Sequence, residues 1–377
     1  MKLISILFFL LAAIFSNAQV PLKEIQGASD IARALLNVGN IRPMSPSYYV
    51  NPFIGTGGHG HTFPGATSPF GMVQLSPDTR YEGWDGCGGY HYSDSVIHGF
   101  SHTHLSGTGI PDYADLLVVP QLGKLNTIPG YLHSGGYGMP FSHKNEQAEA
   151  GYYSVVSNDS KIRVELTSSE RCGIHRYTFI GKGKRYIILD LDYRDKVLDA
   201  GFNQLDSKRI DGFRISESWA SEQHFYFSLN SSVSIQKVES IEKDGQHKLV
   251  LFFEDDLKEL VLKVGVSAVS SEGAHLNFQK EANTTNFDAL RSQNQKLWDQ
   301  ELQKIQVDDD NEDLKTIFYT ALYHTMVVPN IFSDVDGQYR GRDLKIHKID
   351  GLPQYTVFSL WDTYRSTHPL YTLIDQK

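Results

Sequence analysis

Cysteine, basic runs and long apolar stretches are all scarce in this sequence of 377 residues. Its two cysteines, Cys87 and Cys172, can form one disulfide or remain free thiols, and the sequence alone leaves both alternatives open. Lys and Arg form no basic stripe and the net charge is −9 at pH 7, which argues against nucleic acid as a partner. After the N-terminal segment no apolar run is long enough to span a bilayer, so we expect no membrane partner.

A phosphate-binding motif is also missing. Thr56-Gly-Gly-His-Gly60 is not followed by Gly-Lys-Ser/Thr, and no strand–helix unit surrounds it, which excludes nucleotide binding. Glycine itself is plentiful, with thirteen residues between Gly55 and Gly109. This density is typical of loops in which the backbone turns tightly or approaches a ligand.

The first 18 residues have the pattern of a secretory signal peptide. Lys2 precedes an apolar run from Leu3 to Phe15, and the small residues Ser16 and Ala18 fit cleavage after Ala18. No cysteine follows directly, so a lipid anchor is not supported. We therefore expect an exported protein, either periplasmic or secreted.

The middle of the chain has the alternating pattern of β-strands. We assign residues 19–45 to a lead-in segment with a short helix at Ile31–Val38, and residues 46–275 to a β-sandwich domain. Short alternating runs separated by turn residues predict an antiparallel sandwich, and the lack of strand–helix alternation disfavours a parallel sheet. The clearest runs are Ile162–Leu166, Ile174–Phe179, Tyr186–Asp192, Phe225–Asn230, Lys248–Phe253 and Val261–Ser267.

Helical periodicity replaces this pattern toward the C-terminus. We assign 276–308 to a helical linker and 309–377 to the start of a helical domain. A cap at Thr284–Asn286 begins one predicted helix, and an acidic cap at Asp308–Asn311 begins a second, which ends before Pro329. A third candidate helix runs from about 357 to 374. Apolar stripes on three helices require partners that bury them. We therefore expect this chain to be the N-terminal part of a larger protein or to pair with a separate helical subunit.

Histidines gather in and before the stretch GWDGCGGYHYSDSVIHGFSHTHLSGTG (Gly83–Gly109). Two i, i+2 pairs share a face in extended backbone and have the ligand types of a zinc or iron site. Neutral histidines that hydrogen-bond in polar loops explain the same spacing, and we leave both readings open. The set comprises His59, His61, His91, His98, His102 and His104.

Two Trp-Asp pairs indicate carbohydrate chemistry. Trp84-Asp85 and Trp361-Asp362 each place a flat apolar face beside a carboxylate, which suits the C–H face and the hydroxyls of a sugar. Arg365 follows Asp362 at helical spacing. Core packing of either Trp, or a surface Asp362–Arg365 ion pair, is the alternative. The loop Asp334-Val-Asp-Gly337 lacks the rest of a twelve-residue calcium loop, so we interpret it as a turn-rich loop.

The longest uncommon stretches are YVNPFIGTGGHGHTFPGATSPFGMVQLSPDTR, the Gly83–Gly109 segment with the following IPDYADLLVVP, and YTVFSLWDTYRSTHPLYTLI. In these stretches the sequence resembles glycoside hydrolase family 92, the calcium-dependent exo-acting α-mannosidases. The resemblance implies a mainly β fold: an N-terminal β-sandwich, linker helices and the start of an (α/α)6 barrel that is not completed. It also implies an inverting mechanism at the interface of the two domains.

The same resemblance assigns the candidate site residues. Trp84 and the Trp361-Asp362…Arg365 segment match sugar-contacting positions, and Asp85 is interpreted as a sugar ligand rather than a catalytic acid. His102 and His104 match a loop of the family, and we include them among the candidate substrate-binding residues without specifying their role. We assign no catalytic residue and no metal ligand within the chain, because the family's catalytic carboxylates and calcium ligands come mainly from the later barrel, beyond Lys377.

The resulting hypothesis is the N-terminal part of an exported inverting exo-α-mannosidase that acts on terminal α-mannose of N-glycans or mannans. It supplies part of the sugar pocket, is expected to be inactive alone, and has a C-terminal helical domain as its missing partner. Calcium is the expected cofactor of the complete enzyme. A stand-alone carbohydrate-binding β-sandwich protein is the main alternative, and a histidine-metal enzyme is a third.

Overall fold

The computed structural model describes residues 44–241 and 247–376. The predicted signal peptide, the helix at Ile31–Val38 and nearly all of the lead-in segment therefore lie outside the described residues. The residues from Pro46 to Lys377 belong to one structural unit.

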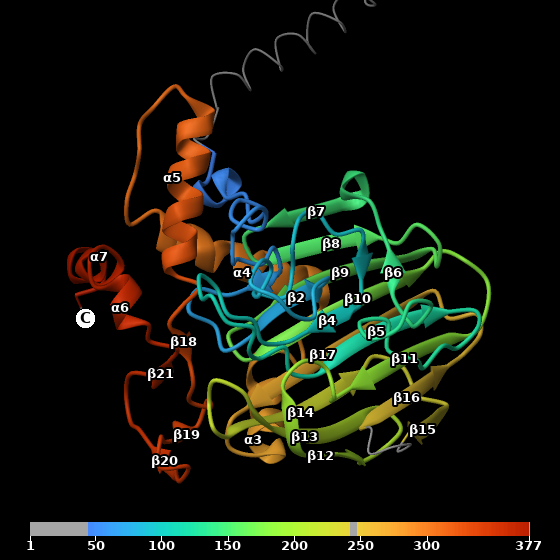
Figure 1. Cartoon of the computed structure of the whole chain (residues 1–377). Helices are drawn as coiled ribbons and strands as arrows, with labels where there is room; N and C mark the ends of the chain where they lie inside the picture. Colours follow the sequence, from blue (N-terminus) through green and yellow to red (C-terminus); the bar gives the residue numbers. More distant parts are fainter. Residues whose placement is uncertain (1–43, 242–246, 377) are drawn as a thin grey trace, which may run out of the picture. The chain divides into compact units, whose positions relative to one another are not determined.

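Two antiparallel sheets form the two layers of this unit (Figure 1). The first has seven strands, in the order β1 (Ala66–Thr67), β2 (Gln74–Asp78), β4 (Gly99–Ser101), β5 (Leu117–Leu122), β11 (Arg185–Asp190), β16 (Lys248–Phe253) and β15 (Lys237–Ile241). The second has eight, in the order β12 (Lys196–Gln204), β13 (Arg209–Glu217), β14 (Gln223–Ser231), β17 (Glu259–Ser267), β10 (Cys172–Phe179), β9 (Ile162–Ser168), β8 (Tyr152–Val156) and β7 (Glu146–Glu149). The predicted mainly β, antiparallel fold is confirmed.

Two-stranded pairings account for the remaining strands of the described residues. They join β3 (Val96–Ile97) to β6 (Met139–Pro140), β18 (Asn330–Ile331) to β21 (Tyr355–Thr356), and β19 (Gln338–Arg340) to β20 (Ile346–Lys348). Short 3-10 turns occur at Pro46–Tyr49 and His143–Asn145.

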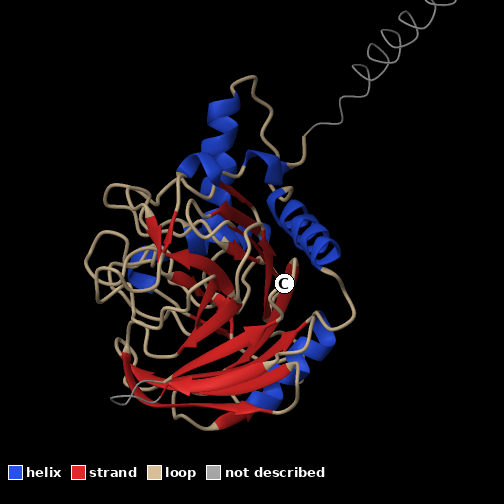
Figure 2. Cartoon of the chain, turned by 90° about the vertical axis from the view of Figure 1, so that its right-hand side faces the viewer, coloured by secondary structure: helices blue, strands red, loops and turns tan. Residues whose placement is uncertain are grey.

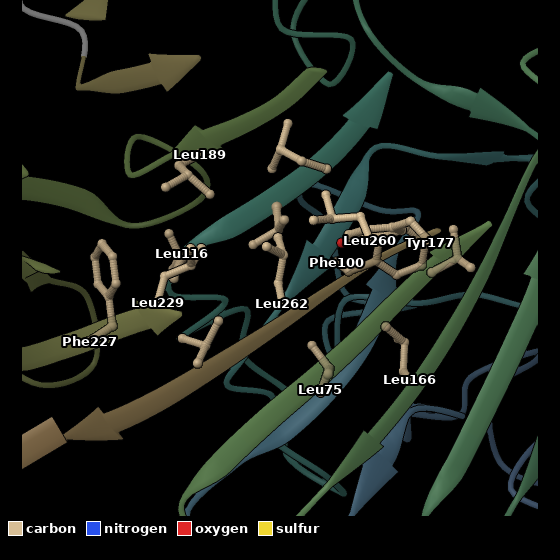
Figure 3. Close-up of a cluster of buried hydrophobic side chains, with 14 of the residues drawn as sticks. Leu75, Phe100, Leu116, Leu166, Tyr177, Leu189, Phe227, Leu229, Leu260 and Leu262 are labelled. Atoms are coloured by element: carbon tan, nitrogen blue, oxygen red, sulfur yellow. The ribbon is translucent and has the colours of Figure 1, made fainter. Parts of the chain in front are cut away.

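The core lies between the two sheets because each central strand turns alternate side chains inward. Leu260 and Leu262 of β17 face Leu75 of β2 and Leu189 of β11 within one buried cluster (Figure 3). Burial of one such leucine contributes roughly 1.5–3 kcal/mol. On the opposite face of β17, Lys263 donates to the carbonyls at the end of the following helix. The alternation of side chains along β17, with a period of two residues, therefore determines which face of the strand lies in the core.

The helices lie outside the two sheets, and the first two of them pack on the eight-stranded sheet (Figure 2). They are α3 (Ser271–Glu281), α4 (Phe287–Leu302), α5 (Glu312–Thr325), α6 (Leu360–Thr363) and α7 (Thr367–Ile374). Helix α3 crosses β17 at Gly265, where an added Cβ would lie 2.2 Å from the carbonyl oxygen of Ala274. Asn286 and Asn311 cap α4 and α5, as predicted from the sequence.

The prediction of one helix over 357–374 is wrong, because the chain forms α6 and α7 with a break at Tyr364–Ser366. Pro369 explains the break: it has no N–H to donate, so it is tolerated in the first turn of α7 and not within a longer helix. Both cysteines are buried free thiols, which excludes the disulfide alternative. In the described part of the chain, no helix has the length and apolarity needed to cross a membrane.

Candidate functional site

Three glycine-rich loops meet at one edge of the sandwich. Gly107 donates from its backbone N to the carbonyl of His61 at 2.9 Å, and Cys87 donates from Sγ to the carbonyl of Thr108 at 2.8 Å. At Gly88 an added Cβ would lie 3.1 Å from that same His61 oxygen. The glycines therefore allow loops 55–62, 80–94 and 105–109 to pack backbone against backbone.

Trp84 lies on these loops with 62% of its surface exposed. Its indole packs edge-on against the His61 ring, with centroids 4.7 Å apart. Below it, an added Cβ at Gly109 would lie 2.3 Å from the indole. Glycine at position 109 and the His61 ring thus hold the indole in place while most of its surface stays open to solvent.

Asp85 accepts a hydrogen bond from Nδ1 of His59 at 2.8 Å, next to Trp84 in the chain. This bond lowers the pKa of Asp85, so the carboxylate stays charged and able to accept hydrogen bonds. The pair is open to solvent, with 38% of the Asp85 side chain exposed. An exposed indole beside an ionised carboxylate is an arrangement that can bind a polyhydroxylated ring.

An arginine distant in sequence holds this loop. Arg194 donates from Nη1 to the carbonyl of Cys87 at 2.9 Å and from Nε to that of Tyr81 at 3.2 Å. Arg80 forms a two-pronged pair with Asp94, with Nη2 to Oδ1 at 2.6 Å and Nε to Oδ2 at 3.2 Å. Sequence reasoning missed both arginines: no local pattern indicates that Arg80 pairs with Asp94, or that Arg194 contacts residues more than a hundred positions away.

His102 and His104 point into the interior and are fully buried. His104 bonds the carbonyl of Gln74 through Nδ1 at 2.8 Å and Asp78 through Nε2 at 3.2 Å. His102 bonds the carbonyl of Leu116 through Nδ1 and lies with its Nε2 3.1 Å from Nε2 of His175. The structure thus places both rings behind the wall of the site, with every ring nitrogen bonded by protein atoms. Their predicted sugar contact stays a prediction.

The histidines of the motif do not gather around one point. Burial lowers the pKa of His102 to about 4 and that of His175 well below its usual value, so both rings are neutral. His91 bonds Ser93 and the carbonyl of Gly58. Within residues 44–241 and 247–376, no three His, Cys, Asp or Glu side chains are grouped to hold a metal ion. The geometry therefore offers no support for a histidine-metal centre.

The second Trp-Asp pair lies on the short helix α6. Trp361 is 86% exposed, and Asp362 accepts a hydrogen bond from the hydroxyl of Ser359. Arg365 lies past the end of the helix and donates to the hydroxyl of Tyr364 at 2.9 Å. Asp362 and Arg365 thus form no ion pair. In the described part of the chain, no hydrogen bond, ion pair or ring contact joins this group to Trp84 and Asp85.

A group of buried carboxylates lies behind the loop 105–116. The backbone N of Tyr113 donates to Asp112 at 2.8 Å and to Asp195 at 2.9 Å. Burial and the neighbouring Asp112 raise the pKa of Asp195 to about 8. Tyr113, Ala114 and Leu116 all have positive φ, an unusual backbone for non-glycine residues. Sequence reasoning missed this cluster because the segment has no periodic pattern.

The carboxylates of the 334–337 loop do not fit a calcium site. Asp334 accepts from Ser267 at 2.6 Å and from Asn277 at 2.8 Å, and Asp336 accepts from its neighbour Gln338. Calcium requires roughly six to eight oxygen ligands around one point, and these side chains bond protein donors instead. The interpretation of this segment as a turn agrees with Gly337 at φ 84°.

Two family models match the chain: the glycosyl hydrolase family 92 N-terminal domain over residues 49–286, and the family 92 catalytic domain over residues 273–377. A family GH92 alpha-mannosidase from Bacteroides thetaiotaomicron is 34% identical with a TM-score of 0.81, over 88% of this chain and 47% of that chain. It has also been solved in complex with mannoimidazole.

Two more distant relatives are also named as glycosidases. A family GH92 inverting mannosidase from Bacteroides thetaiotaomicron VPI-5482 is 25% identical with a TM-score of 0.77, over 88% of this chain and 46% of that one. An uncharacterized secreted glycosidase of Arthroderma benhamiae is 24% identical over an alignment of length 360 that covers 84% of this chain and 45% of the relative. The chain thus spans about half the length of the relatives it matches.

Proposed function

The chain belongs to glycosyl hydrolase family 92, and on this basis we propose that it is the N-terminal part of an exported, inverting exo-α-mannosidase. Its substrate would be terminal α-mannose of N-glycans or mannans. The predicted signal peptide and the secreted relative support export to the periplasm or the outside. The solved complex of a relative with mannoimidazole supports a mannose-like ligand.

One observation carries the proposal: Trp84 and Asp85 stand exposed and fixed at the meeting point of three loops. In the proposed pocket, Trp84 stacks on the C–H face of mannose and Asp85 accepts from its hydroxyls. Trp361, Asp362 and Arg365 join the pocket from the helical side. His102 and His104 support the wall from behind through their bonds to Leu116 and Gln74.

Catalysis is not assigned to this chain. An inverting glycosidase needs two carboxyl groups roughly 6.5–9.5 Å apart that flank the scissile bond, and we identify no such pair at Trp84. We propose that the catalytic carboxylates and the calcium ligands come from a helical partner segment outside residues 1–377. The chain alone is then expected to bind sugar without cleaving it.

Calorimetric titration of the chain with mannoimidazole tests the binding. We expect saturable binding that Trp84→Ala abolishes and Trp84→Phe partly retains, because a smaller aromatic face remains. Leu198→Ala, which removes an exposed apolar side chain from β12, serves as the matched control. Binding that is unchanged in Trp84→Ala would contradict the assignment of this wall. Release of mannose from an aryl α-mannoside by the chain alone would contradict the proposed inactivity.

A stand-alone carbohydrate-binding protein is the second candidate, favoured by the closed sandwich core. Helix α5 argues against it. Leu314 and Ile317, two apolar residues of this helix, are 52% and 59% exposed, whereas Leu322 is buried. Exposed leucine and isoleucine on one helix face are expected where another helical segment packs. A chain that is monomeric and binds no hydrophobic dye would favour the stand-alone candidate.

A further inference from the structure

A hollow of about 740 Å³, called here the second hollow to separate it from the proposed pocket at Trp84, does not have Trp84 among its lining residues. Its walls come from the turn between β13 and β14, from residues 103, 113 and 115, and from the C-terminal segment 330–358. That segment is anchored to the sandwich by Arg340, which donates to the carbonyl of Ala268 at 2.9 Å. The β19–β20 pair of this segment can be followed beside the eight-stranded sheet in Figure 1. The volume falls within the roughly 300–1,000 Å³ of small-molecule sites.

Trp219 lines this hollow and is 77% exposed. It occupies the tip of the β13–β14 turn, where Ser218 donates from its backbone N to the carbonyl of Ala220 at 3.0 Å. The indole packs on no other ring among the residues that the structure describes. Core packing therefore does not explain a tryptophan at this position, and an exposed aromatic at the rim of a hollow is typical of ligand contact.

The polar groups around Trp219 include both signs of charge. Arg342 lines the hollow and, in the described part of the chain, its guanidinium has no hydrogen-bond or ion-pair partner. Glu222 bonds His224 through Oε1 at 2.5 Å, and its Oε2 accepts no hydrogen bond from the described residues. The lining of the hollow thus includes the five N–H donors of one guanidinium and a carboxylate acceptor.

The floor beneath these groups is rigid. Gln223 donates to Oδ2 of Asp115 at 2.6 Å, and Asp115 pairs through Oδ1 with Arg214 at 2.5 Å. Asp115 and Arg214 are wholly buried. The remaining Oε1 of Gln223 is a buried acceptor without a donor among the described residues. A site whose floor is fixed before the ligand arrives loses less conformational entropy on binding.

The exposed indole and the mixed charges around the hollow favour a sugar over an anion as its ligand. Asp115 is already paired with Arg214, and Arg340 donates to the carbonyls of Ala268, Leu344 and Val269. The charged groups left to face a ligand are then Arg342 and Glu222, one of each sign, which does not favour a phosphate or sulfate. A neutral ring with an apolar face and several hydroxyls matches the indole, the donor and the acceptor at once. We propose that this hollow is a second carbohydrate subsite, which binds a mannosyl unit of the glycan other than the one at Trp84. The assignment of mannose rests on the proposed function.

The four tryptophans allow a direct test. In the chain labelled with 15N-tryptophan, each indole N–H gives one signal, assigned with Trp84→Phe, Trp219→Phe and Trp361→Phe. Trp298 is the internal reference, because it is fully buried and donates to the carbonyl of Thr67 at 2.8 Å. The probes are α-mannotriose, methyl α-mannoside and inorganic phosphate.

We expect α-mannotriose to shift the Trp219 signal and leave Trp298 unmoved. Trp219→Ala should weaken α-mannotriose binding roughly three- to tenfold, the range of one aromatic contact, and leave the Trp84 shift with methyl α-mannoside intact. Arg342→Gln removes a guanidinium that holds no partner in the described fold, so it should weaken binding without loss of stability. Leu198→Ala should change neither α-mannotriose binding nor stability.

The outcomes separate the two proposals. A Trp219 signal that stays fixed while Trp84 shifts overturns the second subsite and leaves the proposed function standing. A shift at Trp219 with none at Trp84 supports the subsite and contradicts the Trp84 pocket. A Trp219 response that phosphate reproduces overturns the assignment to a sugar. If no indole responds to either mannoside, both proposals are wrong.

Discussion

Arg214 donates to Asp115 at 2.5 Å, and neither side chain has any exposed surface. The same guanidinium donates to the carbonyls of Leu191 and Tyr193, so it joins the loop before β5 to the loop after β11. A buried charge without its partner is costly, which makes this pair a sensitive probe of the fold beneath the second hollow.

Arg214→Met should therefore lower the free energy of unfolding by about 3–5 kcal/mol, because the Asp115 carboxylate loses its partner while it stays buried. Urea denaturation followed by circular dichroism measures the change. Lys196→Met is the matched control: its pair with Glu217 on β13 is exposed, and its loss should cost less than about 1 kcal/mol. Equal destabilisation in both variants would show that burial does not set the strength of the Arg214 pair.

The carboxyl pair behind loop 105–116 predicts a pH dependence of stability. Asp195 has its pKa raised to about 8 in the folded chain, whereas an unfolded aspartate titrates near 3.9. The folded chain thus holds an extra proton between these values. This contribution to stability is complete below about pH 4 and is lost as the pH rises through about 8.

Asp195→Asn keeps an uncharged side chain at every pH, so its free energy of unfolding should fall less between pH 5 and 9 than that of the unchanged chain. Urea midpoints across this range measure the difference. Asp85→Asn is the control, since the pKa of Asp85 is lowered and its carboxylate is already charged in this window. Parallel curves for Asp195→Asn and the unchanged chain would contradict the role of the pair.

Features set by neighbouring residues could be predicted from the sequence. The alternation in Val261–Ser267 and the caps at Asn286 and Asn311 are local, and the structure confirms them. The predicted helix over 357–374 failed because the first-turn preference of Pro369 outweighs continuous apolar periodicity. Local signals therefore gave the elements more reliably than their ends.

Features set by distant contacts could not be predicted. The spacing of His102 and His104 indicates a shared face but not that this face is buried against His175 and Asp78. Nor does any motif indicate that Arg194 reaches the carbonyl of Cys87, 107 residues away. Trp219 also escaped notice, because an isolated tryptophan in a turn has no pattern until the hollow around it is known.

The close approach of Gly109 to the Trp84 indole leads to a prediction about sugar binding. In Gly109→Ala the new methyl group would lie within 2.3 Å of the indole, so Trp84 must leave its position. We expect weaker mannoimidazole binding and a displaced Trp84 indole signal, with little change in unfolding. Gly57→Ala is the control, because its nearest neighbour is the Cβ of Tyr92 at 3.6 Å. Unchanged mannoimidazole binding in Gly109→Ala would show that the position of the Trp84 indole does not affect binding.

The exposed face of α5 predicts the behaviour of the chain on its own. Leu314 and Ile317 stand open on a helix whose other face packs Leu322 and Tyr323 into a buried cluster. Under the proposed function this face receives a helical segment, so the chain alone should bind a hydrophobic dye and self-associate at high concentration. Leu314→Ser with Ile317→Ser should reduce both without loss of the unfolding midpoint, as sedimentation and dye fluorescence measure.

The matched control for α5 is a change of two other exposed leucines. Leu198→Ala with Leu205→Ser, at and just after β12, should leave dye binding and self-association unchanged, because these side chains lie on a sheet edge rather than on the face that receives the helical segment. Dye binding that persists in the α5 variant would show that the dye binds another hydrophobic surface. The exposed face of α5 would then no longer support a helical partner.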